Sequence, residues 1–147
     1  MTQVINKLKM TVEAKASNES FCRAAVAAFC AVLDPTIEEL NDIKTAVSEA
    51  VTNCIVHAYP LEAGLIYITV ELTKNGRAIV RIKDKGKGIE NVELARQPLY
   101  TSLGGDRSGL GFSVMETFTD KLSVRSAVGR GTTVVLEKQI WGRLLQR

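Results

Sequence analysis

The strongest constraint on the fold of this chain is a long apolar repeat that runs from about Thr36 to Tyr59. Apolar residues recur there at intervals of three and four, which is the spacing of one face of an α-helix. The repeat consists of Ile37, Leu40, Ile43, Val47, Ala50, Val51, Cys54 and Ala58. It predicts the longest helix of the chain, with one side that needs another layer of structure to cover it.

Alternation of apolar and polar residues predicts a set of short strands. The predicted strands cover residues 4–12, 65–72, 78–82, 122–127 and 132–138. Lys74-Asn75-Gly76 is a turn sequence between the second and third strands, and Val128-Gly129-Arg130-Gly131 joins the last two. Both pairs are therefore predicted hairpins, which favours an antiparallel sheet.

Two further helices are predicted, one before and one after the first hairpin. Residues 17–33 begin with Ser17 to Ser20, which offer N-cap side chains, and end at Asp34-Pro35; residues 109–118 follow a glycine-rich loop. In the first of these helices, the apolar residues at helical spacing are Phe21, Ala24, Ala25, Ala28, Phe29 and Val32. The order of elements predicts an α+β fold, a two-layer sandwich of a mainly antiparallel mixed sheet with about three helices on one face.

Length and composition restrict the class of protein. We expect one domain over residues 1–147, because no internal repeat or long linker divides the chain. No apolar run approaches the roughly 18 residues of a membrane span, and residues 1–10 lack the apolar stretch of a secretory signal. We therefore expect a cytoplasmic protein without membrane contact. The formal charge is only +3 and the basic residues are scattered, which argues against direct binding of nucleic acid.

The cysteines and the single histidine do not suggest a metal site. Cys22, Cys30 and Cys54 lie in apolar helical patterns and form no Cys-x-x-Cys pair, so we expect buried, reduced thiols. His57 lies near the end of the long predicted helix. A role as phospho-acceptor or base is open, but an interaction with the helix dipole is favoured.

Glu49 and Asn53 are the first candidate pair for chemistry. They lie four residues apart on the long helix, so their side chains lie one above the other, roughly opposite the apolar positions. A carboxylate beside an amide suits a divalent cation and an activated hydroxyl or water. The alternative is an ordinary solvated helix face.

Asp84 is the second candidate, within Asp84-Lys85-Gly86-Lys87-Gly88. The alternation Ala78, Val80, Ile82 continues to Asp84, which places the aspartate on the apolar face of a strand, at the rim of a pocket. Its carboxylate could accept a hydrogen bond from an exocyclic amine such as that of adenine. Gly86 and Gly88 would let the backbone approach a ligand closely, although an ordinary Asp-x-Gly turn is also consistent with the sequence.

The third candidate is the glycine-rich segment of residues 104–112, which runs into a predicted helix. Free N–H groups at a helix start and the positive end of the dipole favour anions there, and Arg107 adds a charge that can pair with phosphate. A flexible loop without a ligand is the alternative. Neither a Walker-type phosphate loop nor a dinucleotide-binding fingerprint occurs in the chain.

Taken in order, four motifs resemble those of the ATPase superfamily that includes gyrase, histidine kinases and MutL (GHKL). They are Glu49-Ala50-Val51-Thr52-Asn53, Asp84-Lys85-Gly86-Lys87-Gly88, Arg107-Ser108-Gly109-Leu110-Gly111-Phe112 and Gly129-Arg130-Gly131-Thr132-Thr133. Segments 17–23, 33–36, 48–53, 97–101 and 115–118 are similar to those of sporulation anti-sigma factors within that superfamily. The resemblance implies a Bergerat-type ATP-binding fold and a protein serine kinase that also holds a sigma factor.

The resemblance also implies a role for each matched residue. Glu49 would be the general base on the attacking serine, Asn53 would bind Mg²⁺, and Asp84 would read the adenine of ATP or ADP. The residues expected near the nucleotide are Gly86, Gly88, Gly109, Gly111, Arg107 and Thr133, with Thr133 touching the base through water. Arg23 resembles an arginine that contacts both protein partners, a sigma factor and an anti-anti-sigma substrate, and a homodimer is expected.

Two features depart from the family pattern. The segment between Tyr100 and Arg107 is short for a lid over the nucleotide, and Ala58 stands where a glycine often follows the histidine.

Three other functions stay open on the sequence alone: a stress-response anti-sigma kinase, a module that binds a sigma factor without catalysis, and a detached histidine kinase catalytic domain. The sequence shows no dimerising helix with a phospho-acceptor histidine ahead of the long helix, which argues against the histidine kinase domain.

Overall fold

The strands of the protein form one five-stranded sheet. The computed structural model describes residues 2–60, 63–97 and 108–142 of the 147-residue chain. The strands are β1 (Val4–Glu13), β2 (Leu65–Thr73), β3 (Arg77–Asp84), β4 (Lys121–Ala127) and β5 (Gly131–Gln139). Their order across the sheet is β1-β2-β3-β5-β4, and every pairing among the described residues is antiparallel. The predicted mainly antiparallel sheet is confirmed.

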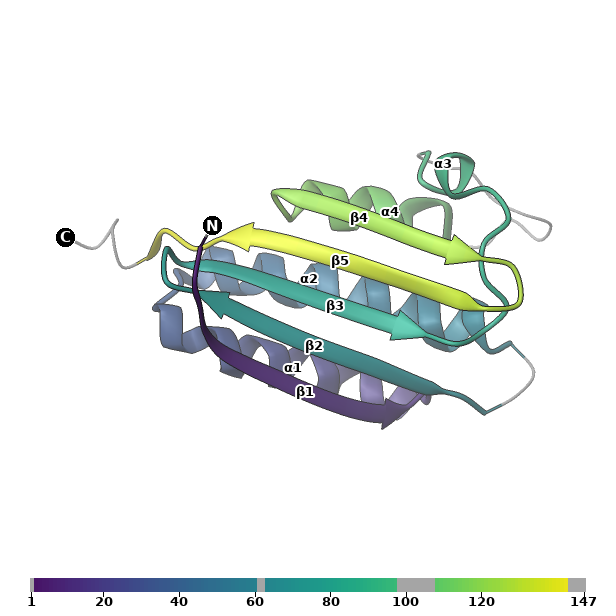
Figure 1. Cartoon of the computed structure of the whole chain (residues 1–147), viewed down its shortest axis with the longest axis horizontal. Helices are drawn as coiled ribbons and strands as arrows, with labels where there is room; N and C mark the ends of the chain where they lie inside the picture. The colour runs from purple at the N-terminus through teal and green to yellow at the C-terminus, as the bar shows by residue number, and fades with distance from the viewer. Residues whose placement is uncertain (1, 61–62, 98–107, 143–147) are drawn as a thin grey trace.

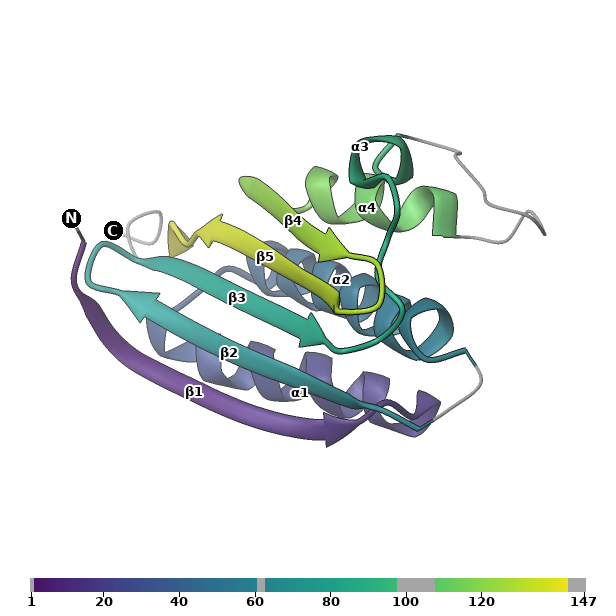
Figure 2. The ribbon, with the colours of Figure 1, turned by 45° about the vertical axis from the view of Figure 1, so that its right-hand side comes forward.

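Three helices lie on one face of the sheet, namely α1 (Glu19–Cys30), α2 (Ile37–Asn53) and α4 (Ser108–Thr117) (Figures 1 and 2). This confirms the predicted two-layer α+β sandwich. A short helix, α3 (Val92–Ala95), follows β3 and was not predicted. Four residues are too few to show helical periodicity, and the cap that starts α3 is local, because the Leu94 N–H donates to the side chain of Asn91.

Helix α2 begins at a capping box and ends in a different kind of turn. Thr36 accepts a hydrogen bond from the Glu39 N–H, and the Glu39 side chain accepts one from the Thr36 N–H. The helix then continues as a π-helical turn, Cys54–Ala58, which we call the π turn. The predicted extent of the long helix is thus confirmed. The looser last turn was not predicted, and such turns occur often at functional sites.

The outward face of α1 is more apolar than a surface helix usually is. Among the residues at predicted helical spacing, Phe21 and Val32 are 56% and 55% exposed, whereas Cys22, Val26 and Cys30 are fully buried. The sequence analysis therefore chose the wrong face of α1 as the buried one. Apolar residues lie on nearly every side of this helix, so their spacing does not identify the side that packs on the core. The predicted capping is also wrong, since the Asn18 amide donates to the Glu13 carbonyl and makes no cap hydrogen bond.

The core lies between the sheet and the helices. Its largest fully buried side chains include Ile66, Ile68, Leu72, Ile82 and Met115. All three cysteines are buried and free of disulfides, as predicted. None of the helices in the described part of the chain is long and apolar enough to cross a membrane.

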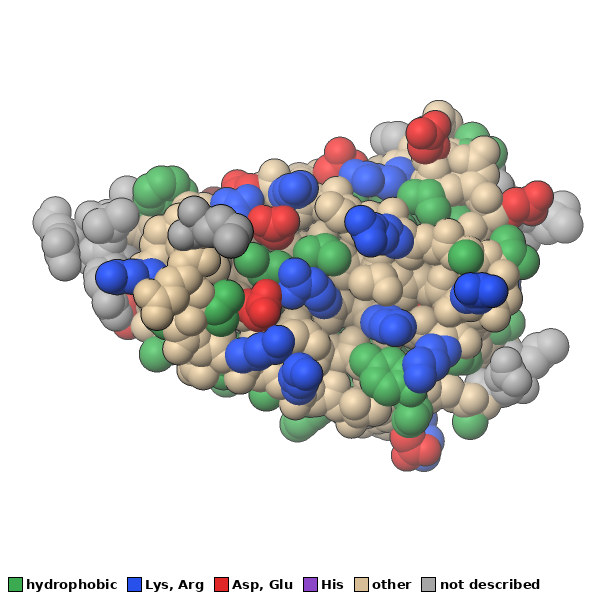
Figure 3. Space-filling model, viewed as in Figure 1, with side chains coloured by type: hydrophobic (Ala, Val, Ile, Leu, Met, Phe, Trp, Pro, Cys, Tyr) green, Lys and Arg blue, Asp and Glu red, His purple; other side chains and the backbone are tan. Residues whose placement is uncertain are grey.

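The opposite face of the sheet is covered by charged side chains rather than by helices, and Figure 3 shows that most of them are basic. Some are held in ion pairs across strands. Arg81 and Lys7 both contact Glu71, and Arg77 and Lys121 both contact Glu137. These pairs help to hold neighbouring strands in register.

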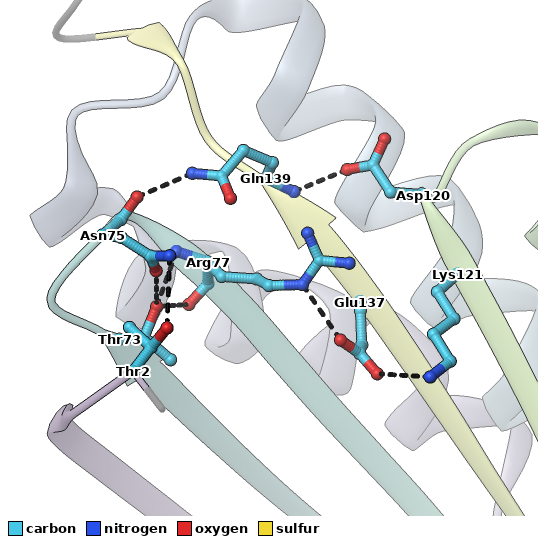
Figure 4. Close-up of polar contacts among 8 residues, drawn as sticks. All are labelled: Thr2, Thr73, Asn75, Arg77, Asp120, Lys121, Glu137 and Gln139. Atoms are coloured by element: carbon cyan, nitrogen blue, oxygen red, sulfur yellow. Dashed lines mark hydrogen bonds and ion pairs between the residues drawn. The ribbon is translucent and has the colours of Figure 1, made fainter.

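A polar network secures the end of the sheet at the β2–β3 turn (Figure 4). The Arg77 N–H donates to the Thr73 hydroxyl at 2.9 Å, and the Gln139 side chain donates to the Asn75 carbonyl at 2.7 Å. The Gln139 N–H donates to the Asp120 carboxylate at 2.6 Å. The network ties β3, β5 and the start of β4 together at the end of the sheet away from Asp84.

Candidate functional site

A cleft of about 800 Å³ opens at the other end of the sheet, where Asp84 ends β3. It is lined by the end of α2, the π turn, the loop after β3, α3, the start of α4, the β4–β5 turn and the start of β5. Figure 2 shows these segments meeting on the right-hand side of the molecule. The volume lies within the range of roughly 300–1,000 Å³ that is usual for small-molecule sites.

Asp84 lies in the floor of this cleft with its carboxylate held in place. The side chain is only 5% exposed and lies on the helix side of β3, as the alternation predicted. Its Oδ1 accepts hydrogen bonds from the Gly86 N–H at 3.0 Å and from the Thr132 N–H at 3.1 Å. The Cys54 thiol donates to Oδ2, with 3.6 Å between sulfur and oxygen. These hydrogen bonds compensate for the burial of the polar carboxyl oxygens.

The π turn is attached to the loop after β3 by hydrogen bonds. The Tyr59 hydroxyl accepts from the Lys85 N–H at 2.6 Å and donates to the Leu65 carbonyl at 2.9 Å. The Lys87 N–H donates to the Ala58 carbonyl at 3.0 Å. Burial raises the pKa of Tyr59. His57 lies in the same turn and lines the cleft, so its position at the helix end is as predicted.

Gly86 and Gly88 approach the backbone of the protein itself, which is a role that the sequence-based argument did not include. A Cβ on Gly86 would lie 2.2 Å from the Ala58 carbonyl oxygen, and one on Gly88 would lie 2.2 Å from that of Ala127. Gly88 also has a φ of +78°, which disfavours other residues. Only Gly88 of the two lines the cleft.

Glu49 and Asn53 lie on the side of α2 that faces the start of α4. Both are partly buried, and neither belongs to the apolar core, as predicted. A Cβ on Gly111 would lie 3.2 Å from Asn53 Oδ1 and 3.6 Å from Glu49 Oε2. The face is therefore covered by α4 and is not an open solvated surface. Asn53 lines the cleft directly.

Comparison with known proteins identifies the family of this chain. Residues 12–138 match the family model for the histidine kinase-like ATPase domain. Over 136 residues the chain is 53% identical to the anti-sigma F factor of Caldanaerobacter subterraneus subsp. tengcongensis, covering 92% of this chain and 94% of that protein. It is 54% identical to the anti-sigma F factor of Clostridium beijerinckii, with 91% and 94% covered. The chain belongs to the anti-sigma F factor family of histidine kinase-like ATPases.

Solved structures show that this family shares its fold with more distant proteins. The RsbU and RsbW domains of a Mycobacterium tuberculosis protein superpose with a TM-score of 0.68 at 20% identity, covering 92% of this chain and 32% of that one. The histidine kinase domain of the Erythrobacter litoralis EL346 blue-light activated kinase gives 0.58 at 18% identity, covering 86% and 63%. The resemblance inferred from the four motifs is confirmed.

The threonine named from the superfamily motif, Thr133, lies on the open face of the sheet at the start of β5. Register pairs Thr133 with Lys83 on the open face of the sheet, so its side chain points away from the cleft. Thr132 lies on the helix side, is 9% exposed and lines the cleft. The signal was available in the sequence, because Thr132 continues the apolar alternation of Val134 and Leu136.

The remaining predicted residues of the family lie at other positions. Gly109 is in the first turn of α4, whereas Arg107 and the whole short segment from Tyr100 that precedes it lie outside the described residues. Arg23 lies on α1 and does not line the cleft; its guanidinium pairs with Glu19 and donates to the Ser48 hydroxyl at 3.5 Å. Cys54, Phe112 and Leu94 also line the cleft but were not predicted, because each has the pattern of an ordinary apolar position in the sequence.

The side chains of the cleft suit Mg²⁺ only together with a phosphate. Within the described ranges, no group of three or more His, Cys, Asp or Glu side chains could hold a metal ion. Mg²⁺ is usually held by one or two protein oxygens, phosphate oxygens and water. The Asn53 amide oxygen, with Glu49 one helical turn before it, fits that mode of binding.

Proposed function

We propose that the chain is a single ATP-binding domain that phosphorylates a serine on an anti-anti-sigma protein and also binds and inhibits a sporulation sigma factor. The observation that carries the proposal is the meeting of Asn53, Asp84 and Thr132 in one cleft. These residues come from α2, β3 and β5, far apart in the sequence. The cleft thus combines a cation ligand, a fixed carboxylate and a hydroxyl.

The base of ATP or ADP would bind at the floor of the cleft. Asp84 would accept a hydrogen bond from the adenine amine, and Thr132 offers a hydroxyl beside it. The Thr132 hydroxyl is itself within 2.8 Å of the Ser126 hydroxyl, which restricts its orientation. The apolar side chains of Ala50, Phe112 and Val134 would cover the faces of the purine ring.

The phosphates would lie toward the start of α4. Gly109 and Gly111 would face them with backbone N–H groups, Arg107 would pair with their oxygens, and Asn53 would hold Mg²⁺, which would neutralise their charge. Glu49 would accept the proton of the substrate serine while the serine oxygen forms its bond to the γ-phosphorus and the bond to the β–γ bridging oxygen breaks. The products are phosphoserine and ADP.

The outward face of α1 supports contact with a protein partner. Large apolar side chains exposed together mark contact surfaces, and here Phe21 on α1 and Val32 in the 3-10 turn that follows it are exposed, with Arg23 on the same helix as Phe21. We propose that the sigma factor contacts Arg23 there, in the cytoplasm. The name of the relatives, anti-sigma F factor, supports a sigma factor as partner. The family resemblance supports a homodimer, which sedimentation would test.

The kinase activity is tested with labelled ATP, Mg²⁺ and a purified anti-anti-sigma protein. We expect labelled phosphoserine with the wild-type protein and none with Glu49→Gln, which should still bind ATP. Glu38→Gln, an exposed change on the same helix, is the matched control and should keep full activity. Absence of phosphoserine with the wild-type protein would rule out the kinase.

The same preparation distinguishes a kinase from a binding module. If the wild-type protein binds a sigma factor more tightly with ATP than without it but transfers no phosphate, only the binding function stands. Equal binding with and without ATP would contradict both functions. Arg23→Ala should weaken sigma binding at least tenfold while nucleotide affinity is unchanged, because Arg23 does not line the cleft.

A further inference from the structure

Cys54 contacts the carboxylate of Asp84 in the floor of the cleft. It is the first residue of the π turn, is 3% exposed and lines the same cleft as Asp84. Its thiol lies 3.6 Å from Asp84 Oδ2, within hydrogen-bond distance for sulfur. Cys54 is thus the side-chain donor that the structure provides to this carboxylate.

The hydrogen bonds of Asp84 leave little capacity for a ligand. A carboxylate has about four acceptor positions, two on each oxygen. The N–H groups of Gly86 and Thr132 occupy both positions on Oδ1, and the Cys54 thiol occupies one on Oδ2. One position on Oδ2 remains for a group that enters the cleft.

The Cys54 thiol is suited to donate a hydrogen bond and not to act as a nucleophile. Burial raises its pKa far above the ordinary value, and the charge of the Asp84 carboxylate raises it further. A thiolate would be the reactive form in oxidation or alkylation, so those reactions are disfavoured here.

We propose that Cys54 is a positioning residue that sets the choice of base: its thiol fixes Oδ2 of Asp84 and leaves a single acceptor position, which selects a purine with an amine over one with a carbonyl. This assignment rests on the proposed nucleotide site. An adenine amine donates to that position. The carbonyl of hypoxanthine or guanine would bring a second acceptor against the carboxylate, and an unmatched buried polar group is costly.

The test compares the affinities for ADP and for inosine diphosphate, which differ at the amine, by calorimetry on the full chain. We expect Cys54→Ala to lower the preference for ADP roughly tenfold, because a second acceptor position on Oδ2 is then open to other donors, such as the ring N–H of hypoxanthine. We expect Cys54→Ser to keep the preference within about twofold, because the hydroxyl donates the same hydrogen bond. Cys30→Ala removes another fully buried thiol that does not contact Asp84, and should leave the preference unchanged.

The outcomes separate this assignment from a packing role and from the proposed function. If Cys54 acts only by filling space, the alanine and serine variants will shift both affinities together and leave their ratio unchanged, which overturns the assignment. A serine variant that loses the preference as fully as the alanine variant also overturns it. Failure of the wild-type protein to bind either nucleotide overturns the proposed nucleotide site, and the assignment with it. Thermal melts of each variant establish that the fold is retained.

Discussion

Gly111→Ala is expected to leave the fold as stable as before, or more stable, while impairing phosphoryl transfer. Gly111 lies inside α4, where alanine is favoured over glycine by about 1 kcal/mol. Against this gain, the new Cβ would lie 3.2 Å from Asn53 Oδ1, so the end of the Asn53 side chain must move by a few tenths of an ångström. We expect a net change in the free energy of unfolding of roughly 0 to +1 kcal/mol.

The same displacement acts on the chemistry, because Asn53 is the proposed Mg²⁺ ligand and Glu49 Oε2 lies 3.6 Å from the new Cβ. Misplacement of a reacting group by about 1 Å can cost roughly 100-fold in rate. We expect a smaller shift here to lower phosphoryl transfer by about 10- to 100-fold. Urea unfolding and labelled-ATP transfer are the two assays.

Ser113→Ala is the matched control for Gly111→Ala. It improves helix propensity on the same helix, two residues away and so on a different side of it. It should retain full transfer activity. The reasoning is refuted if Gly111→Ala transfers phosphate at the wild-type rate. It is also refuted if the variant loses more than about 2 kcal/mol of stability, because Gly111 would then be needed for the fold and not for the site.

Three further changes test other parts of the structure. Thr36→Ala removes one half of the capping box and should lower the free energy of unfolding by about 1–2 kcal/mol in urea, whereas an unchanged midpoint would show that the cap contributes nothing. Asp84→Asn should weaken ADP binding at least tenfold by calorimetry, because the amide cannot both keep its backbone donors and accept from the amine; equal affinity would exclude Asp84 as the base-reading group. Burial raises the pKa of Cys30 from 9.0 to about 12, so the folded state keeps a proton that the unfolded state loses, and stability should fall as pH rises from about 9 toward 12. Cys30→Ala should make that fall shallower by up to about 1.4 kcal/mol per pH unit, and a slope equal to that of the wild-type protein would contradict this.

The fold was predictable where one periodicity was stronger than its alternatives. The alternation of Ile66, Ile68 and Val70 fits only a half-buried strand, and the repeat of α2 fits only one helical face. Helix α1 was different, because apolar residues surround it and the sequence does not distinguish Phe21 from Cys22 as the inward residue. That choice is made by packing against α2 and β2, which the apolar pattern of α1 alone does not reveal.

The residue types of the site were predictable from the sequence, but which of two neighbouring residues faces the cleft was predictable only in part. Asp84 was assigned to the correct face because it continues an apolar alternation that could be counted from Ala78. Thr133 was chosen over Thr132 from a motif, although the pairing of β3 with β5 places only Thr132 beside the Asp84 carboxylate. A motif states which residue types recur, whereas the pleat of the strand decides which of two neighbours enters the cleft.

The glycines of the motifs act on Asp84 before they can act on a nucleotide. A Cβ on Gly86 would meet the backbone of Ala58 in the π turn, and one on Gly131 would lie 2.2 Å from the carbonyl oxygen of Asp84 itself. Two backbone segments can approach the end of β3 this closely only because both residues lack side chains. Their approach brings the N–H groups of Gly86 and Thr132 to Asp84 Oδ1 and the π turn, with Cys54, to Oδ2. The Asp84 carboxylate is therefore oriented by the backbone packing of the fold, and the glycine motif is explained by that packing even without a ligand.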